Sequence, residues 1–277
     1  MSKIIGQAKL MSVIDSYYAR QNLPKTLMFI GPPGCGKHTV AKYIAERFEL
    51  AYEEINENVS SEDLDDYLHK TLDTMYLIDL AKFSEKQQNQ FLKFIEEPSK
   101  SVNIVLTANS EAGVLDTVLN RSTKHYFELY TKEQIEEITN TSINDKAFNI
   151  FKTPGKLINL TESSFNSVLD LANKVVYELT RLSYANALAL STKINYKDLY
   201  NKVDFNLFFD AVEYLALEDF KYHDDIKSLI VFTITNKFKQ YSMQSNLIKE
   251  TLMLNYLTTL WEALQNDING AERGYFK

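Results

Sequence analysis

The chain has 277 residues, 45% hydrophobic and 24% charged, which is typical of a globular protein with two or three small domains. Its net charge of −7 disfavours a protein that binds nucleic acid on its own through a basic face. The charge still allows the chain to contribute a few contacts with nucleic acid within an assembly. We find no apolar run that could span a bilayer and no signal peptide in MSKIIGQAKL. The single cysteine, Cys35, cannot form an internal disulfide, so we expect a reducing cytoplasm.

The first predicted elements surround a glycine-rich segment. Residues 26–30 (TLMFI) form a short apolar run that predicts a strand, and residues 40–48 (VAKYIAERF) place apolar side chains at helical spacing. The intervening segment, GPPGCGKHT, follows the phosphate-loop pattern of Gly, four residues, Gly and Lys. Its candidate nucleotide-binding residues are Gly31, Pro32, Pro33, Gly34, Cys35, Gly36, Lys37, His38 and Thr39. The simpler alternative is a glycine turn before a helix.

His38 departs from the pattern of an active phosphate loop. Glycines let the backbone curl around phosphate, and Lys37 would reach the β and γ phosphates. The next residue is normally Ser or Thr, whose hydroxyl ligates Mg²⁺, a cation that prefers hard oxygen ligands to imidazole. Thr39 cannot take over, because one helical step turns its side chain by about 100°. We therefore expect weak or absent ATP hydrolysis, in a loop that could bind nucleotide through Lys37 and the backbone or stand empty.

Two further apolar strands follow. Residues 75–79 (MYLID) end in Asp79, which could hold Mg²⁺ or cap a helix, and the next residue, Leu80, can accept no proton. Residues 84–97 predict a helix that begins after Ser84 and stops at Pro98, and residues 102–109 predict the third strand. Nearly continuous apolar strands separated by helices indicate an α/β fold whose parallel sheet is covered on both faces.

The remainder of the chain is predicted to be helical. The acidic stretch around residues 60–70 suggests a solvated helix that begins at Ser60 or Ser61. Short helices are expected between residues 131 and 163, with a turn at TPGK (153–156), and a helical bundle from residue 165 onward. The histidines at 69, 125 and 223 show no metal-ligand spacing, so we assign no metal to them.

Several stretches, in order, resemble the clamp-loader branch of the AAA+ ATPases, most closely the delta-prime subunit of bacterial DNA polymerase III. IIGQAKL resembles the family's Ile-Gly-Gln segment beside the adenine pocket, and GPPGCGK resembles its phosphate loop. The most specific piece is YLIDLAKFSEKQQNQFLKFIEEPSKSVNIVLTANS, which resembles the second acidic motif, the Glu-Glu-Pro helix and the sensor strand. TPGKLINL resembles a Ser-Pro-Gly-Lys turn of the lid, and Asn109 falls on the sensor position.

The resemblance implies an AAA+ nucleotide-binding domain over 1–130, a helical lid over 131–163 and a helical collar over 164–277. LDTVLNRSTKHYFEL resembles the segment whose arginine reaches a neighbouring subunit's ATP site, which makes Arg121 a candidate catalytic residue in trans. On composition alone, Arg121 would be a surface ion pair and Lys93 a solvated helix residue. Because the interval between the two nucleotide motifs is short and lacks cysteine, we predict no zinc.

Three functions remain open. The first is a delta-prime-like clamp-loader subunit with a degenerate ATPase, whose partners are the loader ATPase subunits, a delta-like subunit, the sliding clamp and primer-template DNA. ATP or ADP could occupy its loop, with Mg²⁺ weak or absent. The second is an active ATPase motor subunit that tolerates His38. The third is a helical interaction scaffold outside replication. No membrane partner is expected.

Overall fold

The computed structural model describes residues 3–56, 58–178, 205–242 and 249–270, which divide into two compact units. The first comprises residues 1–144 and 152–158, and the second comprises residues 145–151 and 159–277. The predicted lid, 131–163, contributes residues to both units, and its limits as a domain stay a prediction.

The first unit is built on a parallel sheet of five strands in the order β2-β3-β4-β1-β5. The strands are β1 (Thr26–Ile30), β2 (Ala51–Glu54), β3 (Thr74–Asp79), β4 (Val102–Ala108) and β5 (Thr123–Tyr126). The three inner strands are buried almost throughout, as their continuous apolar sequences predict. The parallel α/β sheet is therefore confirmed.

The two edge strands, β2 and β5, were not predicted. Their sequences, AYEE and TKHY, lack an apolar run because their side chains are partly exposed to water. Hydrogen bonding to the inner strands defines them, as β2 pairs with β3 and β5 pairs with β1. Sequence periodicity carries little signal for short polar strands of this kind.

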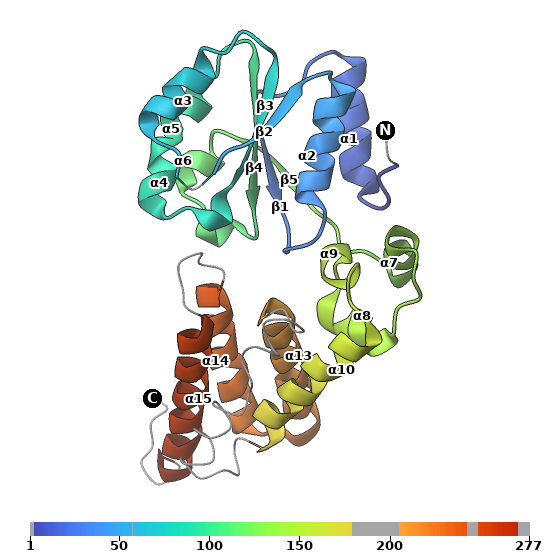
Figure 1. Ribbon diagram of the computed structural model, residues 1–277, viewed down its shortest axis with the longest axis vertical. Helices are drawn as coiled ribbons and strands as arrows, with labels where there is room; N and C mark the ends of the chain where they lie inside the picture. Colours follow the sequence, from blue (N-terminus) through green and yellow to red (C-terminus); the bar gives the residue numbers. More distant parts are fainter. Residues whose placement is uncertain (1–2, 57, 179–204, 243–248, 271–277) are drawn as a thin grey trace. The chain divides into compact units, whose positions relative to one another are not determined.

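Helices cover both faces of the sheet (Figure 1). One face carries α1 (Ala8–Ala19) and α2 (Lys37–Arg47), and the other carries α3 (Ser61–Leu68), α4 (Glu85–Gln90), α5 (Leu92–Glu96) and α6 (Asp116–Leu119). Short 3₁₀ turns, η1 (Leu80–Lys82) and η2 (Glu111–Gly113), complete this unit together with α7 (Lys132–Thr139) and α9 (Pro154–Leu157).

Local signals explain several helix ends. Ser60 caps α3 as predicted, because its hydroxyl accepts a hydrogen bond from the Asp63 amide while the Asp63 carboxylate bonds back. The single helix predicted over 84–97 is instead two, α4 and α5, which meet at the buried Phe91. The predicted turn at 153–156 is a one-turn helix, α9, with Pro154 at its first position.

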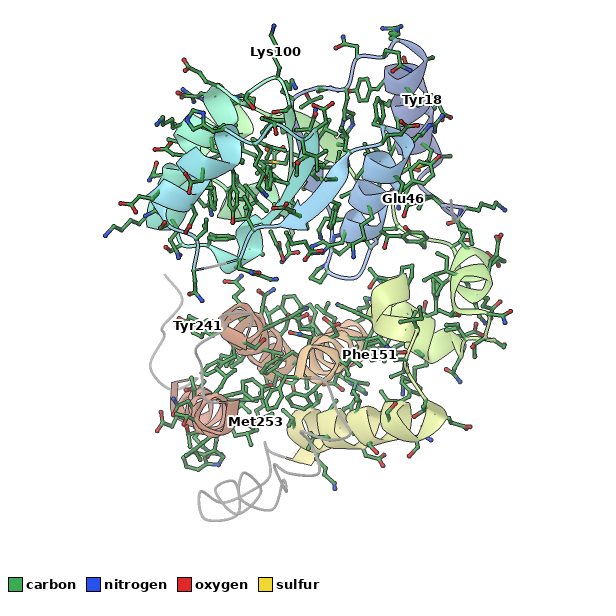
Figure 2. All side chains as sticks on the ribbon, turned by 45° about the horizontal axis from the view of Figure 1, so that its top comes forward. Tyr18, Glu46, Lys100, Phe151, Tyr241 and Met253 are labelled. Atoms are coloured by element: carbon green, nitrogen blue, oxygen red, sulfur yellow. The ribbon has the colours of Figure 1, made fainter. Side chains whose placement is uncertain are left out.

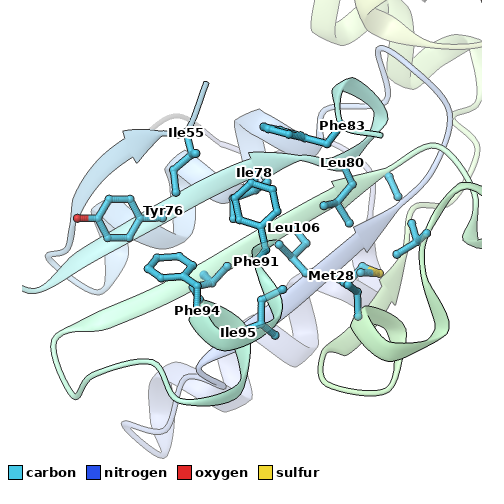
Figure 3. Packing of buried hydrophobic residues seen from close by; sticks show 14 of the residues in the cluster. Met28, Ile55, Tyr76, Ile78, Leu80, Phe83, Phe91, Phe94, Ile95 and Leu106 are labelled. Atoms are coloured by element: carbon cyan, nitrogen blue, oxygen red, sulfur yellow. The ribbon is translucent and has the colours of Figure 1, made fainter. Parts of the chain in front are cut away.

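A hydrophobic core lies between the sheet and helices α3 to α6 (Figure 3). Tyr76 packs edge-on against Phe94, with 5.7 Å between ring centroids, and Phe83 packs against Phe91 at 5.0 Å. Because α5 contributes both Phe94 and Ile95 to this core, the helix is anchored firmly and its polar residues are held in fixed places.

The second unit is helical, as predicted. Its elements are α8 (Asp145–Phe151), α10 (Glu162–Asn173), the π-helical turn η3 (Lys174–Glu178), α13 (Phe205–His223), α14 (Ile226–Ser242) and α15 (Lys249–Gly270). Side chains such as Met253 fill the space between α13, α14 and α15 (Figure 2). Parts of the helical runs predicted at 168–182 and 247–264 lie outside the described residues.

Candidate functional site

Most of the predicted nucleotide-binding residues meet at one edge of the sheet. The phosphate loop, residues 31–39, follows β1, Asp79 ends β3 and Asn109 follows β4. Since β4 pairs in parallel with both β1 and β3, these three chain segments emerge side by side at the carboxyl ends of the strands. That edge is where open α/β sheets bind their ligands.

In the phosphate loop, the carbonyl oxygens of residues 31–35 all accept hydrogen bonds from within the chain. Residues 31 and 32 accept from the Lys37 amine at 2.6 and 3.2 Å, and residue 33 accepts from the Thr153 hydroxyl at 3.0 Å. Residue 34 accepts from the Gly155 amide at 2.8 Å, and residue 35 from the Tyr130 hydroxyl at 2.9 Å. With its carbonyls held this way, the loop has a fixed backbone.

The turn at 153–156 packs directly against the tip of the loop. Gly34 has φ +80°, a left-handed conformation that favours glycine, and a Cβ on Gly155 would lie 2.7 Å from the Gly34 Cα. Two backbones can approach this closely only when both residues lack side chains. The glycine of TPGK is therefore required by the contact it makes with the phosphate loop.

Lys37 is buried, with 7% of its surface exposed, and its amine points back into the loop. Besides the two carbonyls, Nζ donates to Asn109 Oδ1 at 3.4 Å. Burial lowers the pKa of the Lys37 ammonium, and the nearby negative charge of Asp79 opposes part of that change. To bind a phosphate, Lys37 would have to exchange the loop carbonyls for phosphate oxygens.

Asp79 faces its neighbouring strand and does not cap a helix. It precedes the 3₁₀ turn η1 without a side-chain capping bond, and its Oδ1 accepts from Thr107 Oγ1 at 3.0 Å. Leu80 is 1% exposed and packs in the hydrophobic core. Residue 80 therefore presents no group to the site, in addition to lacking a carboxylate.

His38 and Thr39 offer no oxygen ligand in the usual place. The His38 ring is 40% exposed, and its Nδ1 lies 3.9 Å from Glu54 Oε1 on the edge strand β2. Thr39 is exposed on α2. The amides at the start of α2 and the Lys37 amine are groups of the kind that bind phosphate, but residue 38 has no hydroxyl to offer Mg²⁺.

Arg121 lies on another part of the first unit, just after α6. Its Nε forms an ion pair with Glu96 Oε1 at 2.5 Å, and its Nη1 donates to the Thr117 carbonyl at 2.8 Å. We call Arg121, Glu96 and Thr117 the Arg121 corner. Its arginine makes the surface ion pair expected from composition, and 39% of the side chain remains exposed. Lys93 is 74% exposed and pairs with Asp65 at 2.8 Å.

Sequence reasoning did not predict the contacts of two residues that hold the loop region together. Tyr130 bonds to the loop carbonyl described above. Gln7 is 4% exposed and makes paired hydrogen bonds with the backbone of Glu128, both at 2.8 Å, which tie the N-terminal segment to the chain after β5. Both contacts join residues far apart in sequence, so no local pattern reveals them.

We looked for side chains that could bind a metal together in the described part of the chain. No group of three or more His, Cys, Asp or Glu side chains suited to a metal occurs among the described residues. The predicted lack of zinc stays a prediction. None of the described helices is both long and apolar enough to cross a membrane.

The chain is similar in sequence to proteins of DNA replication and recombination. Residues 53–131 match a family model described as DNA polymerase III, delta subunit. A 129-residue stretch is 26% identical to replication-associated recombination protein A of Haemophilus influenzae, covering 43% of this chain and 29% of that protein. The match thus spans less than a third of that relative.

Solved structures share the fold. A DNA polymerase III gamma subunit-related protein of Thermotoga maritima aligns with a TM-score of 0.52 at 13% identity, over 91% of this chain and 99% of that one. A RuvB variant from the same organism aligns with a TM-score of 0.50 at 16% identity, over 74% of this chain and 87% of the other. The matched family segment contains β3, Asp79, the α4–α5 pair, β4 and Arg121. This segment is thus similar in sequence to the DNA polymerase III delta-subunit family, and it lies in a parallel α/β fold that the solved structures share.

Proposed function

We propose that this chain is a delta-prime-like subunit of a DNA polymerase III clamp loader. It assists ATP-dependent loading of the sliding clamp onto primed DNA, within a cytoplasmic hetero-oligomer of loader ATPase subunits and a delta-like subunit. Its own ATPase is degenerate. Its contribution to catalysis is Arg121, donated to the ATP site of a neighbouring subunit.

One observation carries the proposal: the chain's own site has no hydroxyl at position 38 and no carboxylate at position 80, whereas Arg121 is held by two contacts and stays 39% exposed. At its own site, position 38 is a histidine whose Nδ1 lies 3.9 Å from Glu54 Oε1, and position 80 is a leucine in the core. Arginine placed at a transferring phosphate stabilises the charge that develops there, even when it comes from another subunit. A subunit with these two features is suited to serve a neighbour's reaction.

Nucleotide occupancy is part of the proposal. The amides at the start of α2 and the Lys37 amine can bind the phosphates of ATP or ADP, with little contribution from Mg²⁺ because residue 38 offers no oxygen. Neither nucleotide is needed to hold the loop in shape, since its carbonyls already have partners in the chain.

The test is reconstitution with the loader's other subunits, comparing DNA-stimulated ATPase for wild type and Arg121→Ala. At the ATP site that receives Arg121 we expect turnover to fall by about 10³-fold. The total ATPase rate of the assembly should then fall by the fraction which that site contributes. Lys93→Ala is the matched control, because it removes another exposed cation from the neighbouring helix α5.

The outcomes separate the alternatives. An assembly that forms and hydrolyses ATP at the wild-type rate with Arg121→Ala would show that the arginine is not donated. If the purified chain alone hydrolyses ATP and Lys37→Ala abolishes that activity, the chain is a motor subunit. If no clamp or loader subunit binds the chain, it is a scaffold with a role outside replication.

A further inference from the structure

Two groups of the Arg121 corner fix the plane of the arginine side chain. Glu96 Oε1 forms an ion pair with Nε at 2.5 Å, and the Thr117 carbonyl accepts a hydrogen bond from Nη1 at 2.8 Å. A guanidinium is planar and carries its five N–H donors in a rigid fork. Fixing Nε and Nη1 therefore fixes the direction of the third nitrogen as well.

That third nitrogen, Nη2, has no hydrogen-bond partner among the described residues. The Arg121 side chain is 39% exposed, so part of its surface remains open to a partner molecule. The contacts within the chain involve Nε and Nη1, and they leave Nη2 without a hydrogen-bond acceptor in the described part of the chain, so that it can donate to an anion. This division suits a group that must reach beyond its own subunit.

Glu96 is well placed to hold the arginine because the residues before it are buried. Phe94 and Ile95, 1% and 3% exposed, anchor α5 in the core, and the helix ends at Glu96, two residues before Pro98. Thr117 lies on α6, which packs beside α5. Glu96 and Thr117 thus hold Arg121 from two anchored helices.

The Glu96–Arg121 pair contributes little to folding, since both side chains are about 40% exposed and exposed ion pairs are nearly neutral for stability. A fixed orientation matters far more in catalysis, where a displacement of about 1 Å can reduce a rate by about a hundredfold. We propose that Glu96 is a positioning residue, which holds Arg121 in the orientation that reaches the neighbour's ATP. This inference rests on the proposed function.

The opposite role of Glu96 is conceivable on the same geometry and is an outcome of the test. A carboxylate 2.5 Å from Nε could retain Arg121 on its own subunit, so that the neighbour's phosphate must compete for it. Removing the carboxylate would then raise the ATPase rate. Positioning predicts a fall in kcat, and retention predicts a rise.

The chain offers a matched control in the next residue. Glu97 is also an exposed glutamate, and its side chain has no recorded partner within the described part of the chain. Glu96→Gln and Glu97→Gln therefore remove the same charge from adjacent positions, and only the first weakens the contact with Arg121. Glu96→Ala removes the remaining acceptor as well.

The experiment measures DNA-stimulated ATPase of the reconstituted loader with each variant and with Arg121→Ala. We expect Glu96→Gln to lower kcat at the served site by about tenfold and Glu96→Ala by somewhat more, with KM for ATP and assembly unchanged. Glu97→Gln should match wild type. In an Arg121→Ala background, Glu96→Gln should cause no further loss, because a positioning residue acts only through the group it positions.

Failure of the inference and failure of the proposed function give different results. If Arg121→Ala leaves the rate unchanged, the proposed function fails first. If Arg121→Ala lowers the rate while Glu96→Gln matches wild type or exceeds it, only the positioning role is wrong. A loss from Glu96→Gln that persists in the Arg121→Ala background would likewise overturn it. Thermal melting of each variant detects any loss of folding.

Discussion

The phosphate loop and the Arg121 corner are two parts of one α/β unit that use their polar groups in opposite ways. In the loop, five successive carbonyls and the Lys37 amine are bonded within the chain, and the lysine is 7% exposed. In the corner, two of the three Arg121 nitrogens, Nε and Nη1, have contacts within the chain, and the side chain is 39% exposed.

The difference shows what each region contributes. A loop whose backbone is held by the rest of the fold stabilises that fold, so substitutions there should be felt mainly as lost stability. An exposed arginine contributes little to stability, so substitutions there should be felt mainly as lost activity of a partner. If this difference is real, substitutions in the loop and in the strands beside it should change the free energy of unfolding.

The largest effect is expected where the turn at 153–156 meets the loop. A Cβ added at Gly155 would lie 2.7 Å from the Gly34 Cα and 3.0 Å from its carbonyl oxygen, and these backbone atoms cannot easily move. We expect Gly155→Ala to lower the free energy of unfolding by about 2–3 kcal/mol, the usual cost of overpacking, measured by urea denaturation.

The matched control is Gly113→Ala. Gly113 also lies in a short helical turn, but a Cβ there would meet no heavy atom within 4 Å. It should leave stability unchanged or raise it by up to about 1 kcal/mol, the helix preference of alanine over glycine. Since alanine favours helix over glycine by about 1 kcal/mol, a loss at Gly155 cannot come from helix propensity. Equal stability of the two variants would mean that the turn does not brace the loop.

The sequence predicts those parts of the fold and of the site that depend on neighbouring residues in the chain. The inner strands β1, β3 and β4 were predicted because burial on both faces demands apolar runs, and the edge strands β2 and β5 were not. The grouping of Asp79 and Asn109 with the loop follows from the order of parallel strands. Their roles toward a nucleotide stay predictions.

Contacts between residues far apart in the sequence could not be predicted from any local pattern. The sequence drew attention to TPGK and to the Glu-Glu-Pro segment as motifs, but not to their partners. That Gly155 touches Gly34, and that Glu96 pairs with Arg121, depends on how helices α9 and α5 are placed in the folded unit. A motif can therefore be identified in the sequence before the contacts that require its residues are known.

A smaller effect is expected from removing the loop lysine. Lys37→Met leaves the Gly31 carbonyl without its donor, which costs about 1–3 kcal/mol for a buried group. Relief from burying a charge offsets part of that cost, so we expect a net loss of about 1 kcal/mol in the free energy of unfolding. Urea denaturation measures it against Lys42→Met, a lysine on the same helix that is 58% exposed. Equal stability of the two variants would show that Lys37 does not hold the loop.

The smallest effect that we expect is a loss of stability at acid pH, and its source is a histidine on β5 rather than a residue of the phosphate loop. His125 on β5 packs against Tyr17 and Phe29, and burial lowers the pKa of its imidazole below the ordinary 6.5. Below about pH 6.5 the unfolded chain therefore binds a proton that the folded chain resists. The stability that neutral His125 provides is present above that pH and is lost as the pH falls through the folded-state value.

Thermal melting at pH 8 and at pH 5.5, for wild type and His125→Phe, isolates this contribution. The wild type should lose more stability on acidification than the variant does, because phenylalanine keeps the ring contacts and cannot be protonated. His69→Phe is the control, since His69 lies at the end of α3, away from β5. If acidification affects wild type and His125→Phe alike, the acid-sensitive group lies elsewhere. Burial of Lys37 has a separate effect: because its pKa is lowered from 10.5, the unfolded chain holds this proton to higher pH than the folded chain does, and stability rises as the pH rises toward 10.5.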